Sequence, residues 1–452
     1  MKRRDFLKHS SVLGAAMILS NPKSARTAAA NDRIQLAVIG CGSRSDWVCR
    51  DFMVRPQDDV RFKYCCDVDL SRAEKRAKQL TREEIVPQTV QDARTVFDDK
   101  SVDGVVLVTP DHWHALHTIQ ACEAGKDVYC EKPLSRTAFE GEMMINAAKK
   151  YKRIVGAGNQ TRSANYCLTA KKFIEEGNLG KIEFVRVHNM WRDALPTIQT
   201  GVPVPANLDW DKWIGPSPYR EYSPIYMRSL TWGYFWDFGN GLLATQGVHQ
   251  IDVARWILGL NYPKTCYSTG GIDKERLRTQ TPETHSIVYD FGNMIMNIEQ
   301  TMNCPYMLET DWEVREKDMH PYWYQNSTRI EIYGSRYLMV ISRLGAGWQV
   351  FDRTKNRLPV VKAQDYGSYP KMHIEHMSNF VDAMRERKPA HSPVEECHKS
   401  TLLIHYANIS LRAGSVKLEI DQKTGKITNC PEAQKFWRPE FRKEYDIPEI
   451  QG

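Results

Sequence analysis

The sequence predicts an α/β fold in two domains: an N-terminal parallel sheet with helices on both faces, then a C-terminal α+β domain with a large, mostly antiparallel open sheet. Three observations predict it. Short apolar runs alternate with helical stretches between residues 33 and 155, which is typical of βαβ units with right-handed crossovers. Glycines follow the first run, as at a tight strand-to-helix turn. Later strands follow one another with few helices between them, which favours antiparallel pairing.

Size and charge limit the possible functions. The chain has 452 residues, of which 42% are hydrophobic and 26% charged, as in a globular protein of two domains. The formal net charge is +7, but Lys and Arg are interspersed with 55 acidic residues. Because nucleic-acid-binding proteins usually gather their basic residues into a patch, we predict no nucleic-acid partner.

Residues 1–30 have the pattern of a twin-arginine export signal. The pair Arg3-Arg4 precedes a short apolar run, Val12 to Leu19, and Ala28-Ala29-Ala30 offers a cleavage site. The run is too short to span a membrane permanently, and no cysteine follows it to carry a lipid. We therefore expect a periplasmic or otherwise exported protein without a membrane anchor after signal removal. The alternative is an amphipathic N-terminal helix of the mature protein.

Cysteine usage argues against disulfides and metal sites. There are 11 Cys, an odd number without a C-x-x-C pair, and Cys65-Cys66 lies inside an apolar run. These cysteines are typical of small buried hydrophobic residues. His112 and His114 have no further ligands nearby in sequence, so no metal site is predicted.

The first predicted domain spans residues 31–155. Its expected elements alternate strictly between strand and helix. The expected strands are Ile34–Ile39, Val60–Cys66, Val102–Val108 and Asp127–Cys130, and the expected helices run from the glycine turn through Phe52, over Leu70–Leu80 and over His114–Ala124.

The glycine turn after the first strand is the first chemical motif. Gly40 would make the tight turn, Gly42 would let the backbone approach a pyrophosphate, and the following Ser43 and Arg44 would begin the helix. The third small position of the dinucleotide fingerprint is Ser45 instead of Gly or Ala. This pattern predicts a Rossmann domain, although a βαβ unit without nucleotide remains the alternative.

Asp67 ends the second strand, about 25 residues after Gly42, where a carboxylate binds the adenosine ribose hydroxyls. A carboxylate there repels a 2′-phosphate, so NAD is predicted over NADP. Arg44 leaves the second cofactor open, because a nearby arginine can accept that phosphate.

Two further motifs close the next strands: Thr109-Pro110-Asp111-His112-Trp113-His114 and Glu131-Lys132-Pro133. A third, Gly247-Val248-His249-Gln250-Ile251-Asp252, lies in the second half. The carboxyl ends of parallel strands face the ligand crevice of such sheets. In this order and spacing, the three motifs resemble the Gfo/Idh/MocA oxidoreductases, from Arg33 to about Asp421.

The resemblance implies roles for these residues. Lys132 would lie between nicotinamide and substrate, positioned by a cis or strained bond to Pro133, and Glu131 would contact the cofactor ribose. Thr109, Pro110 and His114 would line the nicotinamide side. Members of the family often carry Asp four residues before the catalytic His; here that residue is Thr245. This leaves His249 and Asp252 as the catalytic partners of Lys132.

The residues also fit the chemistry without the family. Oxidation of a secondary alcohol needs a hydride acceptor and a base for the hydroxyl proton. A lysine beside a cationic ring has a lowered pKa, and histidine titrates near neutrality. We expect Lys132 to bind and polarise the hydroxyl and His249 to act as the base. The alternatives are a solvated lysine and a structural histidine at a helix start.

The second predicted domain spans residues 156–413, and residues 414–452 form a tail that the sequence does not place. Gln160 and Arg162, in the link between the domains, are predicted to contact cofactor and substrate respectively. The family resemblance implies that the open sheet makes dimers or tetramers. The expected strands are 181–188, 266–269, 284–289, 294–300, 329–333 and 337–341, and two late helices, about 373–387 and 394–413, are expected to pack back on the first domain.

Two aromatic clusters could bind a sugar. Trp232 and Trp236 lie in a stretch with five aromatic residues in seven, and Trp191 follows a strand together with His188 and Arg192. Sugar C–H faces stack on such rings. The alternatives are packing between domains for the first cluster and surface or interface residues for the second.

Together these observations predict an NAD(P)-dependent oxidoreductase acting on a secondary hydroxyl of a sugar, glycoside or polyol, with a tightly retained cofactor. Three alternatives stay open: a glycosidase that oxidises, eliminates and reduces with the same NAD, a cofactor-bearing sugar-binding protein without turnover, and a dehydrogenase using free cofactor in the cytoplasm.

Overall fold

The computed structural model describes residues 33–191, 197–272, 279–303, 327–342, 347–354 and 368–451. The predicted export signal and Arg192 lie outside these ranges. Within them, no helix combines the length and apolarity that a membrane crossing requires.

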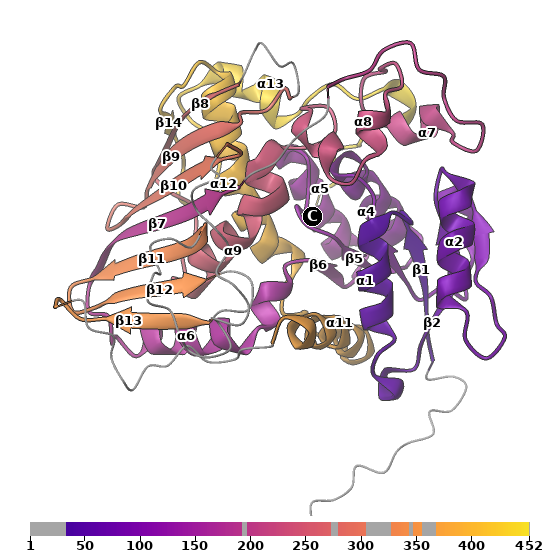
Figure 1. Ribbon diagram of the computed structural model, residues 1–452, viewed down its shortest axis with the longest axis horizontal. Helices are drawn as coiled ribbons and strands as arrows, with labels where there is room; N and C mark the ends of the chain where they lie inside the picture. Colours follow the sequence, from indigo (N-terminus) through magenta and orange to yellow (C-terminus); the bar gives the residue numbers. More distant parts are fainter. Residues whose placement is uncertain are drawn as a thin grey trace, which may run out of the picture.

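The first domain is built on a six-stranded parallel sheet with the order β3-β2-β1-β4-β5-β6 (Figure 1). The chain places β2 and β3 on one side of β1 and then β4, β5 and β6 on the other side, so the strand order reverses between β1 and β4. Nucleotides bind outside the carboxyl ends of the strands at such a point. The strands are β1 (Ile34–Ile39), β2 (Val60–Cys66), β3 (Gln88–Val90), β4 (Gly104–Leu107), β5 (Asp127–Cys130) and β6 (Val155–Ala157).

Helices cover both faces of this sheet. The helices of this region are α1 (Ser43–Phe52), α2 (Leu70–Leu80), α3 (Ala93–Asp98), α4 (His114–Glu123), α5 (Ala138–Lys150) and α6 (Asn165–Glu175). Residues of α4 and α5 pack with Ile39, Leu107 and Cys130. Residues of α1 and α2 pack with Leu36 and Val38 on the opposite face. The strands are buried from both sides, which explains their continuous apolar sequences.

The second domain contains an eight-stranded sheet with the order β13-β12-β11-β7-β10-β9-β8-β14. Its strands are β7 (Ile182–Met190), β8 (Thr265–Gly271), β9 (Thr284–Asp290), β10 (Ile295–Thr301), β11 (Thr328–Gly334), β12 (Leu338–Ser342), β13 (Trp348–Phe351) and β14 (Leu418–Glu419). Among the described strand pairs of this second sheet, only β7–β10 is parallel. The predicted fold class, a Rossmann domain followed by a mostly antiparallel sheet, is confirmed.

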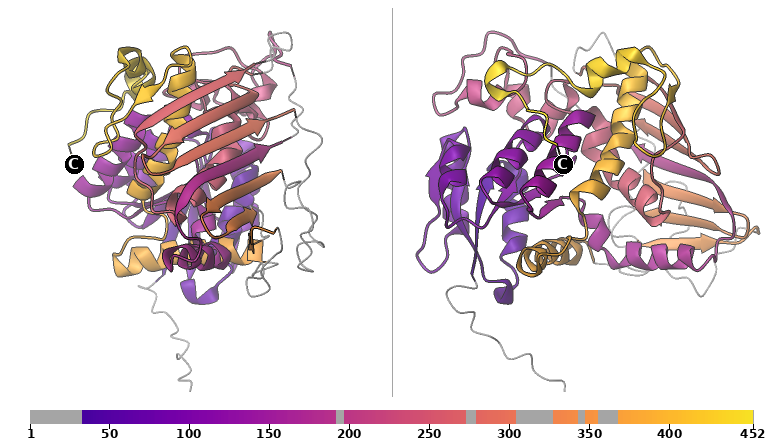
Figure 2. Two further views of the ribbon diagram at one scale, coloured as in Figure 1. Left: turned by 90° about the vertical axis from the view of Figure 1, so that its left-hand side faces the viewer. Right: turned by 180° about the vertical axis from the view of Figure 1, so that it is seen from behind.

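Three long helices join the two domains. α9 (Val248–Ile257) and α12 (Val394–Arg412) lie against one face of the large sheet, whose other face is turned to the viewer in the left panel of Figure 2. α11 (Ser368–Glu386) returns to the first domain, where Met377, Phe380 and Val381 pack with Phe52 of α1.

A long segment after β7 crosses back over the first domain. We call residues 197–234 the strap. It carries α7 (Trp210–Ile214), α8 (Pro224–Met227) and η5 (Thr231–Tyr234), which lie above α2 and α4 in Figure 1. Its own aromatic core includes Trp210, Trp213 and Tyr226, joined by Phe235 and Phe238 just after it.

The described part of the tail, residues 414–451, also has a definite place. β14 pairs with β8, and α13 (Gln434–Trp437) follows. The chain then returns to the first domain, where the Ile450 carbonyl accepts a hydrogen bond from Asn146 at 2.6 Å. On the way, the short turn η9 (Lys443–Tyr445) places Tyr445 edge-on against Trp113, with ring centroids 5.5 Å apart.

Candidate active site

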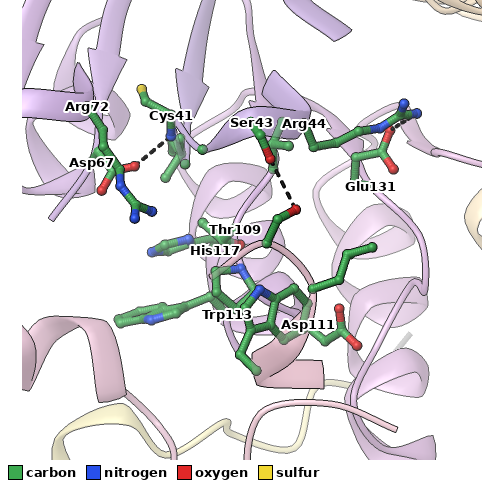
Figure 3. Close-up of a pocket in the computed structure, with 18 of the residues that line it drawn as sticks. Cys41, Ser43, Arg44, Asp67, Arg72, Thr109, Asp111, Trp113, His117 and Glu131 are labelled. Carbon is green, nitrogen blue, oxygen red and sulfur yellow. Dashed lines mark hydrogen bonds and ion pairs between the residues drawn. The ribbon is translucent and has the colours of Figure 1, made fainter. Parts of the chain in front are cut away.

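A cavity of about 1110 Å³ lies where the first domain, the second domain, the strap and the tail meet. This volume is slightly above the range of about 300–1,000 Å³ that is usual for small-molecule sites. The carboxyl ends of β1, β2, β4 and β5 open into it, and Figure 3 shows the side chains along this edge. The cavity brings together most of the residues that the sequence predicts for cofactor and chemistry. These are Gly40, Gly42, Ser43, Arg44, Asp67, Thr109, Pro110, Glu131, Lys132, Gln160, Trp232 and His249.

The glycine turn has the geometry of a pyrophosphate site. Gly40 adopts φ +94°, and a Cβ there would lie 2.6 Å from the backbone of Val108, so only glycine fits. Gly42 caps α1, and a Cβ there would meet nothing within 4 Å. Ser45 replaces the third small residue without crowding, because it is fully buried and its hydroxyl donates to the Gly42 carbonyl at 2.7 Å. The N-terminus of α1 therefore faces the cavity, as in the anion sites at helix N-termini.

Asp67 anchors the turn from the neighbouring strand. Its carboxylate accepts the N–H of Cys41 at 2.6 Å and the N–H of Asp69 at 2.9 Å. Burial raises the pKa of Asp67, while these two N–H groups oppose the shift. Figure 3 shows Arg72 beside Asp67, whereas Arg44 lies across the turn with Glu131. Arg44, which the sequence suggested as a possible partner for a 2′-phosphate, therefore lies next to Glu131 and away from Asp67.

Replacing Asp67 with alanine should reduce the preference for NAD over NADP. The variant loses charge-assisted hydrogen bonds to the ribose hydroxyls, worth about 1.5–3 kcal/mol each, and also the repulsion of a 2′-phosphate. Affinity for NADH should fall roughly tenfold or more while affinity for NADPH falls less, measured by fluorescence titration of cofactor-free protein.

Asp103→Ala is the matched control, because its carboxylate also accepts a backbone N–H, that of Gln35 at 2.7 Å, but outside the cavity. Equal affinity of the wild type for NADH and NADPH would overturn this reading of Asp67.

Glu131 is the centre of a hydrogen-bonded network. Its carboxylate is 3.1 Å from the Arg44 guanidinium and accepts a hydrogen bond from the Gln160 amide at 2.8 Å. Tyr129 lies at 3.4 Å. Burial opposes ionisation of Glu131, but Arg44 and Lys132 hold its pKa below the ordinary value. Arg44 and Gln160 therefore hold the Glu131 carboxylate in place as a hydrogen-bond acceptor.

Lys132 reaches from the first domain to the second. Its Nζ donates to the Thr245 carbonyl at 2.7 Å, and the Lys132–Pro133 peptide bond is cis. Thr245 lies in η6 (Leu243–Gly247), a single π-helical turn that runs directly into α9, and such turns are frequent at functional sites. His249, the second residue of α9 and four residues after Thr245, lines the same cavity. Lys132 thus reaches across the domain boundary to the turn that leads into the helix of His249.

His114 has a structural place instead of the predicted lining role. It is 1% exposed, does not line the cavity, and its two ring nitrogens lie 2.9 Å from the Pro133 carbonyl and 3.0 Å from the Thr109 carbonyl. Burial lowers its pKa. The imidazole connects the two strand-end motifs, and the cofactor lining falls to Thr109 and Pro110.

Asp252 and Arg162, predicted as catalytic and substrate-binding, do not line the cavity. They form a buried ion pair with an N–O distance of 2.6 Å, and each is 1% exposed. Ser400 donates a further hydrogen bond, at 2.6 Å, to Asp252. The two charged groups thus bind each other, and their ion pair connects α9 to the link between the domains. The sequence predicted roles in catalysis and substrate binding for these two residues, whereas the structure shows them bound to each other.

The aromatic residues predicted for substrate divide in the same way. Trp232 lines the cavity. Trp236 instead stacks against the Arg412 guanidinium, 4.7 Å from the ring centroid, and Trp191 donates to Asn189 at 2.7 Å. His188 lies beside Glu331 at 3.5 Å. These three side chains lie outside the cavity, so a direct role for Trp236 and Trp191 in substrate binding is not supported.

Among the cavity residues that the sequence missed are those of the strap other than Trp232 and those of the tail. The strap contributes a wall, and the tail contributes Glu444 and Tyr445. The sequence of the strap has no periodic hydrophobic pattern from which its position in the cavity wall could have been predicted. Asp111 is a further omission: it lies inside a recognised motif, lines the cavity and is 1% exposed, and its carboxylate could have been noted as a potential proton carrier.

Comparison with known proteins shows family matches in both domains. Residues 34–159 match the family profile described as "Oxidoreductase family, NAD-binding Rossmann fold", and residues 171–280 match "Oxidoreductase family, C-terminal alpha/beta domain", both of Gfo/Idh/MocA type. Together these segments make up more than half of the chain.

Individual relatives are more distant. Levoglucosan dehydrogenase from Pseudarthrobacter phenanthrenivorans is 34% identical over 173 residues, which is 38% of this chain and 37% of that protein. A scyllo-inositol 2-dehydrogenase (NADP(+)) from Bacillus subtilis is 32% identical over 220 residues, 48% of this chain and 51% of that protein. The chain thus spans about half or less of these relatives' length.

The solved structure of a levoglucosan dehydrogenase in complex with NADH and levoglucosan superimposes with a TM-score of 0.63 at 20% identity, covering 86% of this chain and all of that one. At this identity the match establishes the fold. The residues present fit a dinucleotide: the Gly40 position excludes a Cβ, the N-terminus of α1 opens into the cavity, and Asp67 and Glu131 mark its two ends. With this site and these matches, the chain belongs to the Gfo/Idh/MocA family of NAD-binding oxidoreductases.

Proposed function

We propose that this protein oxidises a secondary hydroxyl of a sugar, glycoside or polyol with a nicotinamide cofactor that it retains, NAD in preference to NADP. One observation carries the proposal: a single cavity joins the glycine turn and Asp67 at one end to Lys132 and His249 at the other. The same cavity is also lined by Trp232, Thr161 and Gln246, an aromatic and polar lining that suits a carbohydrate.

The division of labour follows from the residues. Bound NAD supplies a hydride acceptor. The chain itself must bind the hydroxyl and remove its proton. Lys132 is held at the domain boundary by the Thr245 carbonyl, where its amine can donate to a substrate oxygen. His249 lines the same wall from α9 and is suited to receive the proton near neutral pH.

The strap supports cofactor retention. It pairs with the first domain at two places: Leu208 bridges to Asp69, which follows β2, and Ser229 lies 3.2 Å from Ser43 through their hydroxyls, next to the glycine turn. In the middle, the Trp213 carbonyl is 2.9 Å from the His112 ring and accepts the Trp113 indole N–H at 3.1 Å. A dinucleotide in the cavity would lie beneath these contacts, so its release requires the strap to open.

Retention of the cofactor also fits the proposed export signal. We propose that residues 1–30 direct the folded, cofactor-loaded protein out of the cytoplasm. Free NAD is not expected there, so each turnover must return the cofactor to its starting state. Transfer between two sugars, epimerisation, and oxidation–elimination–reduction of a glycoside all meet that condition. Translocation of a reporter fused behind residues 1–30, abolished by Arg3→Lys with Arg4→Lys, tests the signal.

The substrate class is tested with defined probes. Levoglucosan, scyllo-inositol and methyl β-D-glucoside should be assayed with added NAD, and p-nitrophenyl glycosides without it. Reduction of NAD by one of the first set supports a dehydrogenase. Release of p-nitrophenol without added cofactor supports the glycosidase alternative. Sugar binding by calorimetry, with neither reaction, would support the binding protein and overturn the proposal.

Retention gives a prediction of its own. After extensive dialysis, the purified protein should still contain close to one nicotinamide per chain, quantified by mass and absorbance after denaturation. Gly215→Ala should accelerate cofactor loss, because Gly215 has φ +51° and a Cβ there would lie 2.2 Å from the Trp113 ring, which displaces the strap.

Gly201→Ala is the matched control: Gly201 also has a positive φ, +70°, but a Cβ there would meet nothing within 4 Å. Cofactor lost from the wild type with a micromolar dissociation constant would favour the ordinary dehydrogenase that uses free NAD.

A further inference from the structure

The C-terminal tail places an aromatic ring in the wall of the cavity. Tyr445 of η9 lines the cavity and lies edge-on against Trp113, with ring centroids 5.5 Å apart and planes at 88°. Trp113 in turn stacks face to face on His117, with centroids 4.4 Å apart and planes at 18°. Trp113 and His117 line the same cavity. We call these three side chains the aromatic wall.

The aromatic wall lies toward the end of the cavity that Asp67 marks. His117 contacts Phe97 of α3, with ring centroids 6.0 Å apart. α3 begins three residues after Val90, the last residue of β3, and the carbonyl of Val90 accepts the N–H of Asp67 at 3.1 Å. In Figure 3, His117 lies toward Asp67, and Glu131 lies at the opposite side of the picture. The wall therefore borders the region where Asp67 would bind the adenosine ribose.

The strap fastens the tail at this same end. Arg442 pairs with Asp211 of α7 at an N–O distance of 2.8 Å, and its guanidinium lies 5.3 Å from the centroid of the Tyr445 ring. The chain just before α7 is bound to the chain just after β2, because the N–H of Asp209 donates to the Val68 carbonyl at 3.0 Å. Arg442 therefore links Tyr445 to a part of the strap that is anchored beside the end of β2.

We propose that Tyr445 is a cofactor-binding residue, whose ring completes an adenine subsite with Trp113 and His117, and that Arg442 positions it by pairing with Asp211. The inference rests on the proposed function only in that a dinucleotide occupies the cavity. Bases of any kind stack on aromatic side chains, and edge-on contacts between rings are also favourable. Burial lowers the pKa of His117 to about 3, so the wall presents uncharged rings to an uncharged base.

The first test follows cofactor release from the whole protein. Protein loaded with NADH is mixed with a large excess of NAD, and the change in NADH fluorescence gives the release rate. Tyr445→Ala should raise this rate roughly tenfold, the scale on which one stacked ring stabilises a base. Tyr445→Phe should keep the wild-type rate, because the ring remains. Tyr219→Ala is the matched control, since Tyr219 lies on the strap, is 64% exposed and does not line the cavity.

The second test identifies the half of the cofactor that the tail contacts. AMP and nicotinamide mononucleotide are titrated as competitors of NADH. Tyr445→Ala should weaken binding of AMP roughly tenfold and leave binding of nicotinamide mononucleotide unchanged. Equal weakening of both competitors would mean that the whole cavity has loosened, and it would overturn the proposal, as would no change in either.

The positioning role of Arg442 is tested through its partner. Asp211→Ala removes the ion pair from a residue that does not line the cavity. Because an exposed ion pair stabilises only modestly, the release rate should rise about twofold to fivefold, and less at high salt. In a Tyr445→Ala background, Asp211→Ala should have no further effect. A rise that persists without the ring would overturn the positioning role.

These measurements need no sugar turnover, so the two proposals fail separately. A changed release rate and a selective loss of AMP binding, without activity on any probe sugar, uphold the adenine subsite and count against the proposed function. An active enzyme whose constants do not respond to Tyr445→Ala keeps the proposed function and overturns the adenine subsite. A protein that binds no NADH would overturn both.

Discussion

Replacing Lys132 with alanine is expected to lower turnover at least about a hundredfold, the usual contribution of a positioned proton-transfer or polarising group. The Lys132 side chain crosses the boundary between the two domains, where its Nζ donates to the Thr245 carbonyl at 2.7 Å. Affinity for NADH should survive, because Asp67, Glu131 and the glycine turn remain. Steady-state kinetics and fluorescence titration measure the two effects separately.

Lys126→Ala is the matched control for Lys132. The Lys126 amine also donates to backbone carbonyls, those of Asp99 at 2.5 Å and Val102 at 2.9 Å, but it does not line the cavity. Its loss should lower stability and leave kcat unchanged. If Lys132→Ala kept near wild-type turnover, Lys132 would have no part in the mechanism.

Breaking the Arg162–Asp252 pair should destabilise the protein by about 3–5 kcal/mol, the cost of leaving one buried charge uncompensated. Arg162→Leu leaves the carboxylate of Asp252 buried with Ser400 as its remaining described partner. Urea unfolding monitored by Trp fluorescence measures the loss. The double variant Arg162→Leu with Asp252→Leu should recover much of it, because an apolar pair of similar volume carries no orphaned charge.

The same pair sets a pH dependence. Burial opposes ionisation of Asp252, but Arg162 lowers its pKa below the ordinary value, about 3.9 in unfolded chains. The resulting stability is present above that ordinary value and is lost as the pH falls through the lowered folded value. An exposed pair such as Lys181–Glu183 contributes little by comparison. If Arg162→Leu cost less than about 1 kcal/mol, the pair would not hold the domains together.

Strand-end chemistry was predictable from the sequence because it depends on local order. An apolar run followed by Gly40, or by Glu131-Lys132, places those residues at one edge of a parallel sheet whatever the rest of the chain does. Asp127–Cys130 and Leu70–Leu80 were predicted with the observed bounds. The edge strand Gln88–Val90, with three residues, is too short to show a periodic pattern.

Other features depend on contacts between distant residues. Asp252 pairs with Arg162 across 90 positions, and no local pattern distinguishes that partner from a substrate. The strap was missed because its helices have only 5 and 4 residues and are held by an aromatic core. One local signal was overlooked: Thr137 and Glu140 form a capping box that begins α5, and the T-x-x-E pattern is readable in the sequence.

The position of Tyr445 sets an order of events during synthesis. Tyr445 and Glu444 form part of the wall around a cavity whose glycine turn lies at residues 40–42. The ribosome therefore completes the dinucleotide turn some four hundred residues before it delivers the last piece of wall. Until then the wall around Trp113 lacks Tyr445, and we expect a dinucleotide to enter the cavity more easily before the tail is in place than after it.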